Sequence, residues 1–251
     1  MLSGTGVIVT RPAAQSHAVA RMIEAIGGRA ILFPALEISA HQPAAQSRAA
    51  LAEADIAIFI SANAVAFGLR YAKENLLKNL QLAAIGNATA QALKNQGYGD
   101  IIVPESGADS EALLATAALQ AVAGKEIVIF RGVGGRETLR SALCQRGAKV
   151  AYIECYTRRA PAVSTSAVAD LIDRDDIAVI HVLSRETLEN FCTMIGPENA
   201  ATLRHKPLFV PHPAVLEGAR MLGFGDVTIT GFGDGGLIAA LQQRFGNSTN
   251  L

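Results

Sequence analysis

The stretch Gly97-Tyr98-Gly99-Asp100-Ile101 recurs later in the chain as Gly223-Phe224-Gly225-Asp226-Val227. Two further pairs of segments match in the same way: Val7–Arg11 with Ile127–Arg131, and Ile60-Ser61 with Leu183-Ser184. The starting positions of these pairs differ by 126, 120 and 123 residues (97 to 223, 7 to 127, 60 to 183). Such a period is far longer than that of a solenoid repeat and is the size of a domain. The sequence therefore predicts two similar domains from an internal duplication.

Composition excludes several classes of protein. Half of the 251 residues are hydrophobic, 18% are charged and the formal net charge is zero, which favours a large buried core over disorder. A neutral chain has no overall field to attract nucleic acid or an anionic membrane surface, and tryptophan is absent, which leaves little for base stacking. No apolar run approaches the ~18 residues of a membrane span. We expect neither a nucleic-acid partner nor a membrane partner.

The cysteines and the first residues point to a reducing location. Cys144, Cys155 and Cys192 are odd in number and have no metal-type spacing. The segment before Val7 lacks the basic and apolar regions of a signal peptide. We expect a cytoplasmic protein with no disulfide and no metal site.

Short β-branched runs alternate with helical patterns along the whole chain. Because the runs are apolar throughout rather than alternating, they are typical of strands buried on both faces of a parallel sheet. The fold class is therefore α/β and doubly wound. The ten predicted strands are Val7–Thr10, Ala30–Phe33, Ile56–Ile60, Leu82–Ile85, Ile101–Val103, Glu126–Phe130, Val150–Ile153, Ile177–Leu183, Leu208–Val210 and Val227–Thr230.

Ten strands divide into two sets of five in two ways. A tandem division near Gly124 is one, and the repeats alone do not exclude it. The other uses two extended segments, 36–43 and 155–161, as interdomain linkers that could pair as a short ladder. It gives a discontinuous lobe A of residues 1–35 plus 162–251 and a lobe B of residues 44–154. The two extended segments favour this second division.

Polar residues and glycines follow many of the predicted strands. In open α/β sheets, ligands bind at the carboxyl ends of strands and at the helix N-termini that follow, where free N–H groups and the helix dipole attract anions. Serine, threonine and asparagine are also ordinary helix N-caps, so each residue alone has that simpler explanation. The residues that we predict to bind an anionic ligand are Thr10, Arg11, Ser61, Asn63, Gly86, Asn87, Thr89, Arg131, Gly132, Ser184 and His212.

Familiar catalytic motifs are absent, and one tyrosine stands out. The segment Arg131–Glu137 follows a strand but has Glu137 where a dinucleotide fingerprint needs its third glycine. His181 falls within a strand, where a packed core residue is the simpler interpretation than a metal ligand. Tyr156 lies in the returning linker, and there its phenol would face the seam between the lobes. A phenol can give or take one proton and can hydrogen-bond a leaving hydroxyl, although a tyrosine bridging two lobe surfaces would look the same.

At these residues the chain resembles the uroporphyrinogen-III synthase family. The matching pieces keep the family's order and spacing over nearly the whole chain, although each is weak alone. They are Thr10-Arg11-Pro12 with Gln15, Phe59–Val65, Ala84–Ala90, Pro104, Ser110–Leu113, Arg131-Gly132, Gly135-Arg136 and Tyr156-Thr157-Arg158.

The resemblance implies two flavodoxin-like lobes joined by a two-stranded linker, which supports the discontinuous division. It implies a cofactor-free lyase of tetrapyrrole and haem biosynthesis. Such enzymes convert hydroxymethylbilane, with loss of water and inversion of ring D, into uroporphyrinogen III. The substrate carries eight carboxylates, which suits many helix N-termini around one site. We expect a monomer, and the preceding enzyme of the pathway is the candidate protein partner.

The resemblance also implies roles for particular residues. Tyr156 would assist loss of the substrate hydroxyl, Thr89 would line the cleft, and Ser61 and Ser184 would occupy equivalent turns. The chain departs from the family pattern at Pro211-His212-Pro213, where proline cannot donate an N–H to an anion.

Two other functions stay open at this point. A two-lobed protein that binds a small anion without catalysis would show the same turns. A nucleotide-dependent enzyme would require the dinucleotide fingerprint that this sequence lacks.

Overall fold

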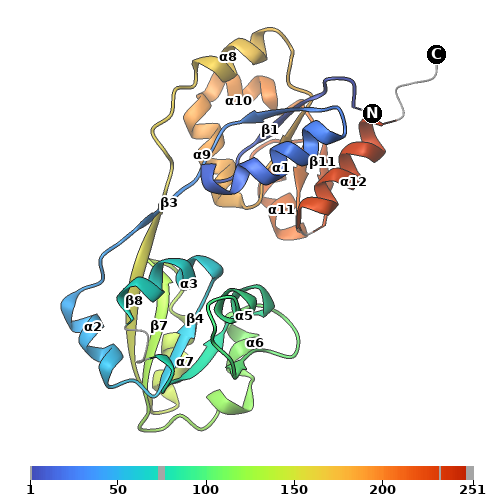
Figure 1. Ribbon diagram of the computed structural model, residues 1–251. Coiled ribbons are helices and arrows are strands. Elements are labelled where there is room, and N and C mark those ends of the chain that lie inside the picture. The colour runs from blue at the N-terminus through green and yellow to red at the C-terminus, as the bar shows by residue number, and fades with distance from the viewer. Residues whose placement is uncertain (1, 73–76, 232, 247–251) are drawn as a thin grey trace. The chain divides into compact units, whose positions relative to one another are not determined.

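The computed structural model describes residues 2–72, 77–231 and 233–246. The chain divides into two compact units. Unit 1 contains Met1–Glu37 and Arg159–Leu251, and unit 2 contains Ile38–Arg158. The chain thus leaves unit 1 after Glu37 and returns to it at Arg159 (Figure 1).

Unit 1 is built on a five-stranded sheet in the order β2-β1-β9-β10-β11, in which all neighbours are parallel. Its elements are β1 (Gly6–Val9), α1 (Ala13–Ala25), β2 (Arg29–Leu32), α8 (Ser166–Asp173), β9 (Val179–His181), α9 (Arg185–Ile195), α10 (Pro197–Leu203), β10 (Leu208–Val210), α11 (Pro213–Met221), β11 (Val227–Ile229) and α12 (Gly233–Phe245).

Unit 2 contains most of a six-stranded sheet in the order β3-β8-β7-β4-β5-β6. The pairs from β8 to β6 are parallel. The elements are β3 (Glu37–Ala40), α2 (Ala45–Ala52), β4 (Ile56–Phe59), α3 (Ala62–Gly68), a 3-10 turn (Leu69–Tyr71), β5 (Gln81–Ala84), α5 (Asn87–Lys94), β6 (Ile101–Ile102), α6 (Ser110–Leu114), a second 3-10 turn (Ala117–Leu119), β7 (Glu126–Gly132), α7 (Thr138–Gln145) and β8 (Lys149–Arg159).

Without β3, the two sheets have the same strand order. In β2-β1-β9-β10-β11 and β8-β7-β4-β5-β6, the strand pairs β1 and β7, β9 and β4, and β11 and β6 hold equivalent places. Each pair of segments that repeats in the sequence falls on one of these strand pairs or directly beside it. The repeated sequence therefore corresponds to repeated topology.

Each sheet is covered by helices on both faces, which explains its continuous apolar strands. In β1, Ile8 packs in one apolar cluster with helices α8 to α11, whereas Val7 and Val9 pack in another with α1 and α12. In β4, Phe59 faces α2, α3 and α5, and Ile58 faces α6 and α7. Successive side chains of a strand point to opposite faces, so both faces must be apolar when both are buried.

All ten predicted strands are present, and the α/β prediction with parallel sheets is confirmed. The helices α2, α8 and α10 were not predicted. Within the two segments expected to be extended, residues 36–43 contain β3, and residues 155–159 are the last part of β8, which neighbours β3 in the sheet. Among the residues that the structure describes, no helix has the length and apolarity needed to cross a bilayer.

Strands β3 and β8 lie side by side and run in opposite chain directions. Arg159 donates to the carboxylate of Glu37, the hydroxyls of Ser39 and Thr157 are 2.9 Å apart, and the N–H of His41 donates to the carbonyl of Cys155. Partner numbers fall along β8 as they rise along β3, which identifies an antiparallel pair.

His181 gives unit 1 a predicted acid sensitivity. The ring is 2% exposed, and burial, with a smaller effect of Arg11, lowers the pKa of His181 to about 3. Unfolding returns its pKa to about 6.5, so the stability from the neutral ring is present above that pH and falls as pH drops below it. We expect the wild type to lose about 2 kcal/mol more unfolding free energy between about pH 7.5 and pH 5 than the His181→Gln variant.

The measurement is urea unfolding followed by far-UV circular dichroism, since all four tyrosines (71, 98, 152 and 156) lie in unit 2 and tryptophan is absent. Parallel pH dependences of the two proteins would show that His181 is not kept neutral by the fold.

Candidate active site

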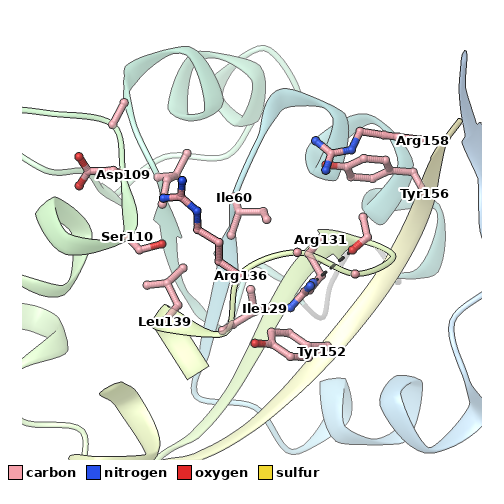
Figure 2. Close-up of a pocket in the computed structure, with 15 residues that line it drawn as sticks. Ile60, Asp109, Ser110, Ile129, Arg131, Arg136, Leu139, Tyr152, Tyr156 and Arg158 are labelled. Atoms are coloured by element: carbon pink, nitrogen blue, oxygen red, sulfur yellow. Dashed lines mark hydrogen bonds between the residues drawn. The ribbon is translucent and has the colours of Figure 1, made fainter. Parts of the chain in front are cut away.

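A pocket of about 330 Å³ lies in unit 2. It is bounded by the carboxyl ends of three neighbouring parallel strands, at Ile60 after β4, Ile85 after β5 and Arg131 in β7. This edge of the sheet is where open α/β folds place ligands. Figure 2 shows the residues around it, which are Ile60, Ile85, Ala108, Asp109, Ser110, Ile129, Arg131, Gly132, Gly134, Gly135, Arg136, Leu139, Tyr152, Tyr156 and Arg158.

Tyr156 is held firmly at one wall of the pocket. It is 3% exposed, and its hydroxyl lies 3.1 Å from the hydroxyl of Ser61. Ser61 is the N-cap of α3 and accepts the N–H of Ala64 at 3.0 Å. The other side of the ring lies against Gly132, where a Cβ would stand 2.7 Å from a ring carbon of Tyr156. The orientation of the phenol is therefore fixed, and its hydroxyl is within hydrogen-bond distance of Ser61.

A register shift in β8 explains the burial of Tyr156. Arg131 pairs with Glu154, but Gly132 pairs with Tyr156, so β8 has one extra residue at this point. The neighbours Cys155 and Tyr156 are both buried as a result. Burial also raises the pKa of the Cys155 thiol to about 12, which makes this cysteine a packing residue rather than a nucleophile.

Arg131 lies at the floor of the pocket within a cluster of acidic and aromatic groups. Its guanidinium donates to Glu137 at 3.1 Å and to the carbonyl of Gly132 at 3.2 Å, and lies 3.8 Å from Glu154. The ring of Tyr152 lies under it at 4.1 Å. Tyr152 donates its hydroxyl to Glu137 at 2.9 Å.

The titration of this cluster follows from those contacts. Burial, followed by the hydrogen bond to Glu137, raises the pKa of Tyr152 to about 12. The hydrogen bonds from Tyr152 and then Arg131 hold the pKa of Glu137 below its ordinary value. At neutral pH Glu137 is therefore a carboxylate, and Tyr152 is a neutral phenol that donates to it.

Two further arginines reach the pocket from other segments. Arg136 belongs to the loop between β7 and α7, and Arg158 is near the end of β8. Both are exposed residues, in contrast to Arg131, and Figure 2 shows their guanidinium groups within the pocket region. With Asp109 as the acidic lining residue, the lining is positive overall and suits a carboxylate-bearing ligand.

The structure brings together part of the predicted binding set in unit 2. Arg131, Gly132 and Tyr156 line the pocket, and Ser61 lies directly behind Tyr156. Asn63, Gly86, Asn87 and Thr89 lie at the starts of α3 and α5, along the same edge of the sheet but outside the pocket lining. Thr89 is buried.

The other predicted residues lie in unit 1, along the carboxyl edge of β1, β9 and β10. Arg11 forms an ion pair with Asp234. Ser184 is the N-cap of α9, and His212 caps α11 by accepting the N–H of Ala214 on Nδ1. Thr10 is fully buried, and its hydroxyl donates to the carbonyl of His181, so it joins β1 to β9.

Tyr156, which we predicted in the returning linker, belongs to β8 and packs in the apolar core of unit 2. Sequence analysis also left Arg136, Tyr152 and Arg158 out of the binding set. Arg136 was visible in the loop after a predicted strand, and Arg158 follows Tyr156 by two residues, which is the strand period.

Ser61→Ala is expected to destabilise unit 2 by about 1 kcal/mol, because α3 loses its N-cap. Ser61→Thr keeps a hydroxyl cap and should cost only a few tenths of a kcal/mol. Urea unfolding monitored by tyrosine fluorescence measures both, since every tyrosine lies in unit 2. Equal losses in the two variants would show that the cap contributes nothing.

Comparison with known proteins identifies the family. The family model described as uroporphyrinogen-III synthase HemD matches residues 17–239. Uroporphyrinogen-III synthase from Escherichia coli K12 is 33% identical over 245 residues, which cover 94% of this chain and 99% of that protein. The enzyme from Synechococcus elongatus is 34% identical over 204 residues, covering 78% and 76%.

The chain belongs to the uroporphyrinogen-III synthase family. It is accordingly a lyase, and the alternative of a binding protein without catalysis is not favoured. Solved uroporphyrinogen-III synthases share the fold. A mutant of the Thermus thermophilus enzyme has a TM-score of 0.63 at 16% identity, covering 96% of this chain and 100% of that one. The Helicobacter pylori enzyme has a TM-score of 0.62 at 15% identity, with the same coverage.

Proposed function

We propose that this member of the family cyclises hydroxymethylbilane, with loss of water and inversion of ring D, to uroporphyrinogen III. The observation that carries the proposal is the fixed phenol of Tyr156 in a positively lined pocket at the carboxyl edge of unit 2. A phenol at that place can protonate a departing hydroxyl, and cations around it can hold a substrate that carries eight carboxylates.

The reaction requires the protein to donate one proton and to hold the substrate in one geometry. Proton donation from Tyr156 to the hydroxymethyl oxygen breaks the carbon–oxygen bond, releases water and leaves an azafulvenium cation on ring A. The substituted carbon of ring D attacks this cation to form a spiro intermediate, which fragments and closes again with ring D inverted. Loss of a proton from the pyrrole carbon that formed the last bond then gives the neutral product, and Tyr156 can take this proton back.

Catalysis on this account is mainly control of conformation. The same cation closes directly to the type I isomer when nothing holds ring D. Binding energy from the carboxylates must therefore be used to select one geometry for attack, which is catalysis by positioning and differential binding.

Ser61 supports the phenol in this proposal. Its oxygen accepts the N–H of Ala64 and lies 3.1 Å from the Tyr156 oxygen. A hydroxyl in that place can donate to the phenolate left after proton transfer, which lowers the free energy of the charged state.

We also propose the finer organisation of the chain. The shared strand order of the two sheets supports an internal duplication, and the antiparallel contacts of β3 with β8 support a two-stranded linker at about residues 36–43 and 155–161. The division into unit 1 and unit 2 supports the discontinuous lobes. Thr10, Arg11, Ser184 and His212 in unit 1, with Asn63, Gly86, Asn87 and Thr89 in unit 2, remain predicted substrate contacts, supported by their places after parallel strands.

The four tyrosines allow a direct test of the site. Tyr152 and Tyr156 line the pocket, whereas Tyr71 and Tyr98 do not. In protein labelled with carbon-13 in the tyrosine rings, uroporphyrinogen III added without oxygen should shift the Tyr152 and Tyr156 resonances and leave those of Tyr71 and Tyr98 in place. Shifts confined to Tyr71 and Tyr98, or no shift at saturation, would place the ligand elsewhere.

A further inference from the structure

A large part of the pocket in unit 2 is lined by aliphatic side chains. Ile60 and Ile85 follow β4 and β5, and both are half-buried at the pocket. Ile129 in β7 and Leu139 in α7 also line it, and both belong to the core between the sheet and helices α6 and α7. Such side chains offer no hydrogen bond to a carboxylate, but covering them with the face of a flat ring removes apolar surface from water. The lining therefore suits a ring of the substrate as well as its charged arms.

Polar groups lie on two sides of this aliphatic lining. Figure 2 shows Tyr156 on one side of the pocket and Ser110 and Arg136 on the other, and in this view Ile60 lies between them. Arg136 is exposed, and Ser110 is the first residue of α6, whose N-cap is Asp109. A guanidinium and a hydroxyl are both donors that suit a carboxylate. The pocket thus has a phenol on one side and carboxylate-binding groups on the other.

The volume of the pocket limits how much of the substrate can enter. At roughly 30 Å³ for each water molecule of the liquid, a pocket of about 330 Å³ holds about eleven of them. One pyrrole ring with its acidic arms has about 15 non-hydrogen atoms, which are bonded more closely than separate water molecules and fill about the same space. A linear tetrapyrrole has four such rings. One ring fits the pocket, and four do not.

We propose that the pocket of unit 2 holds ring A of the substrate alone, with its hydroxymethyl group at Tyr156 and an acidic arm at Arg136 and Ser110. This inference rests on the proposed function and deepens it. A single ring presents both kinds of group, because the hydroxymethyl group and the acidic arms are attached to different carbons of the same pyrrole. The other three rings lie outside the pocket, so ring D is free to turn and reach the azafulvenium carbon while ring A is held.

Binding of a single pyrrole tests this inference directly. The probe is a 2-methylpyrrole that carries one acetate and one propionate arm and, having no leaving group, does not react. In protein labelled with carbon-13 in the tyrosine rings, it should shift the resonances of Tyr152 and Tyr156, which line the pocket, and leave those of Tyr71 and Tyr98 in place. We expect saturable binding with a Kd of about 1 mM, which is ordinary for a ligand of about 15 non-hydrogen atoms.

Two matched comparisons test how the ring lies in the pocket. Arg136→Met should raise the Kd of the probe about 10-fold, the effect of one lost charge-assisted contact. Arg48→Met, at an exposed arginine of α2 outside the pocket, should leave the Kd unchanged. The dimethyl ester of the probe keeps the ring but has no charge, so it should bind the wild type at least about 10-fold more weakly than the diacid.

The outcomes distinguish this inference from the proposed function. The inference is overturned if Tyr152 and Tyr156 do not shift at about tenfold the expected Kd, or if Arg136→Met binds the probe as tightly as the wild type. Neither result would affect synthesis of uroporphyrinogen III by the wild type. A wild type that forms no type III isomer would overturn the proposed function, and the assignment of ring A with it.

Discussion

Tyr156→Phe is expected to lower kcat by about 100- to 1,000-fold, the contribution of a well-placed general acid. The substitution removes one oxygen, which lies 3.1 Å from Ser61, and leaves the ring against Gly132 and Phe67. Because the ring provides the packing, the fold should persist and KM should change little. The measurement is the rate of hydroxymethylbilane consumption, corrected for its spontaneous closure.

Tyr71→Phe is the matched control, since Tyr71 lies in the same unit but does not line the pocket. Circular dichroism should show that both variants are folded. Wild-type kcat in folded Tyr156→Phe would remove this phenol from the mechanism.

Gly132→Ala is expected to lower kcat about 10-fold or more by displacing the Tyr156 ring. The added Cβ would stand 2.7 and 2.9 Å from two ring carbons, closer than carbon atoms can approach. Gly132 in β7 and Tyr156 in β8 are both buried, so the ring of Tyr156 must move to make room for the added methyl group. We also expect a loss of about 1–3 kcal/mol in unfolding free energy, which is typical of overpacking.

Gly99→Ala controls for the added methyl group, because nothing lies within 4 Å of its ideal Cβ and its backbone is not left-handed. Kinetics and urea unfolding on the two alanine variants should differ strongly. If Gly132→Ala keeps wild-type kcat, the position of the Tyr156 ring is not critical to turnover.

The strands were predictable because their signal is local and strong. Parallel strands buried on both faces are continuous apolar runs, and all ten of the runs predicted as strands are strands. The missed elements have weaker signals. Helix α2 (Ala45–Ala52), for example, is short and buries Leu51 alone. Their positions depend on contacts with distant segments, which no local pattern reveals.

The sequence predicted the edge of the sheet at which the active site lies, but it did not predict which residues form the pocket there. The rule that ligands bind after parallel strands located Ser61, Arg131 and Gly132. The rule could not distinguish Arg131 from Arg136. Arg131 is buried and contacts Glu137 and Glu154, and these contacts depend on the tertiary fold. Nor could it place Tyr156, since one extra residue in β8 changes which side chains point inward.

The isomer of the product tests the central claim most directly. Hydroxymethylbilane is generated in situ with and without the protein, the products are oxidised, and the type I and type III isomers are separated by chromatography. We predict that the wild type yields mainly the type III isomer, while the reaction without protein yields type I. Only type I isomer from the folded protein would contradict the claim that this pocket directs the inversion of ring D.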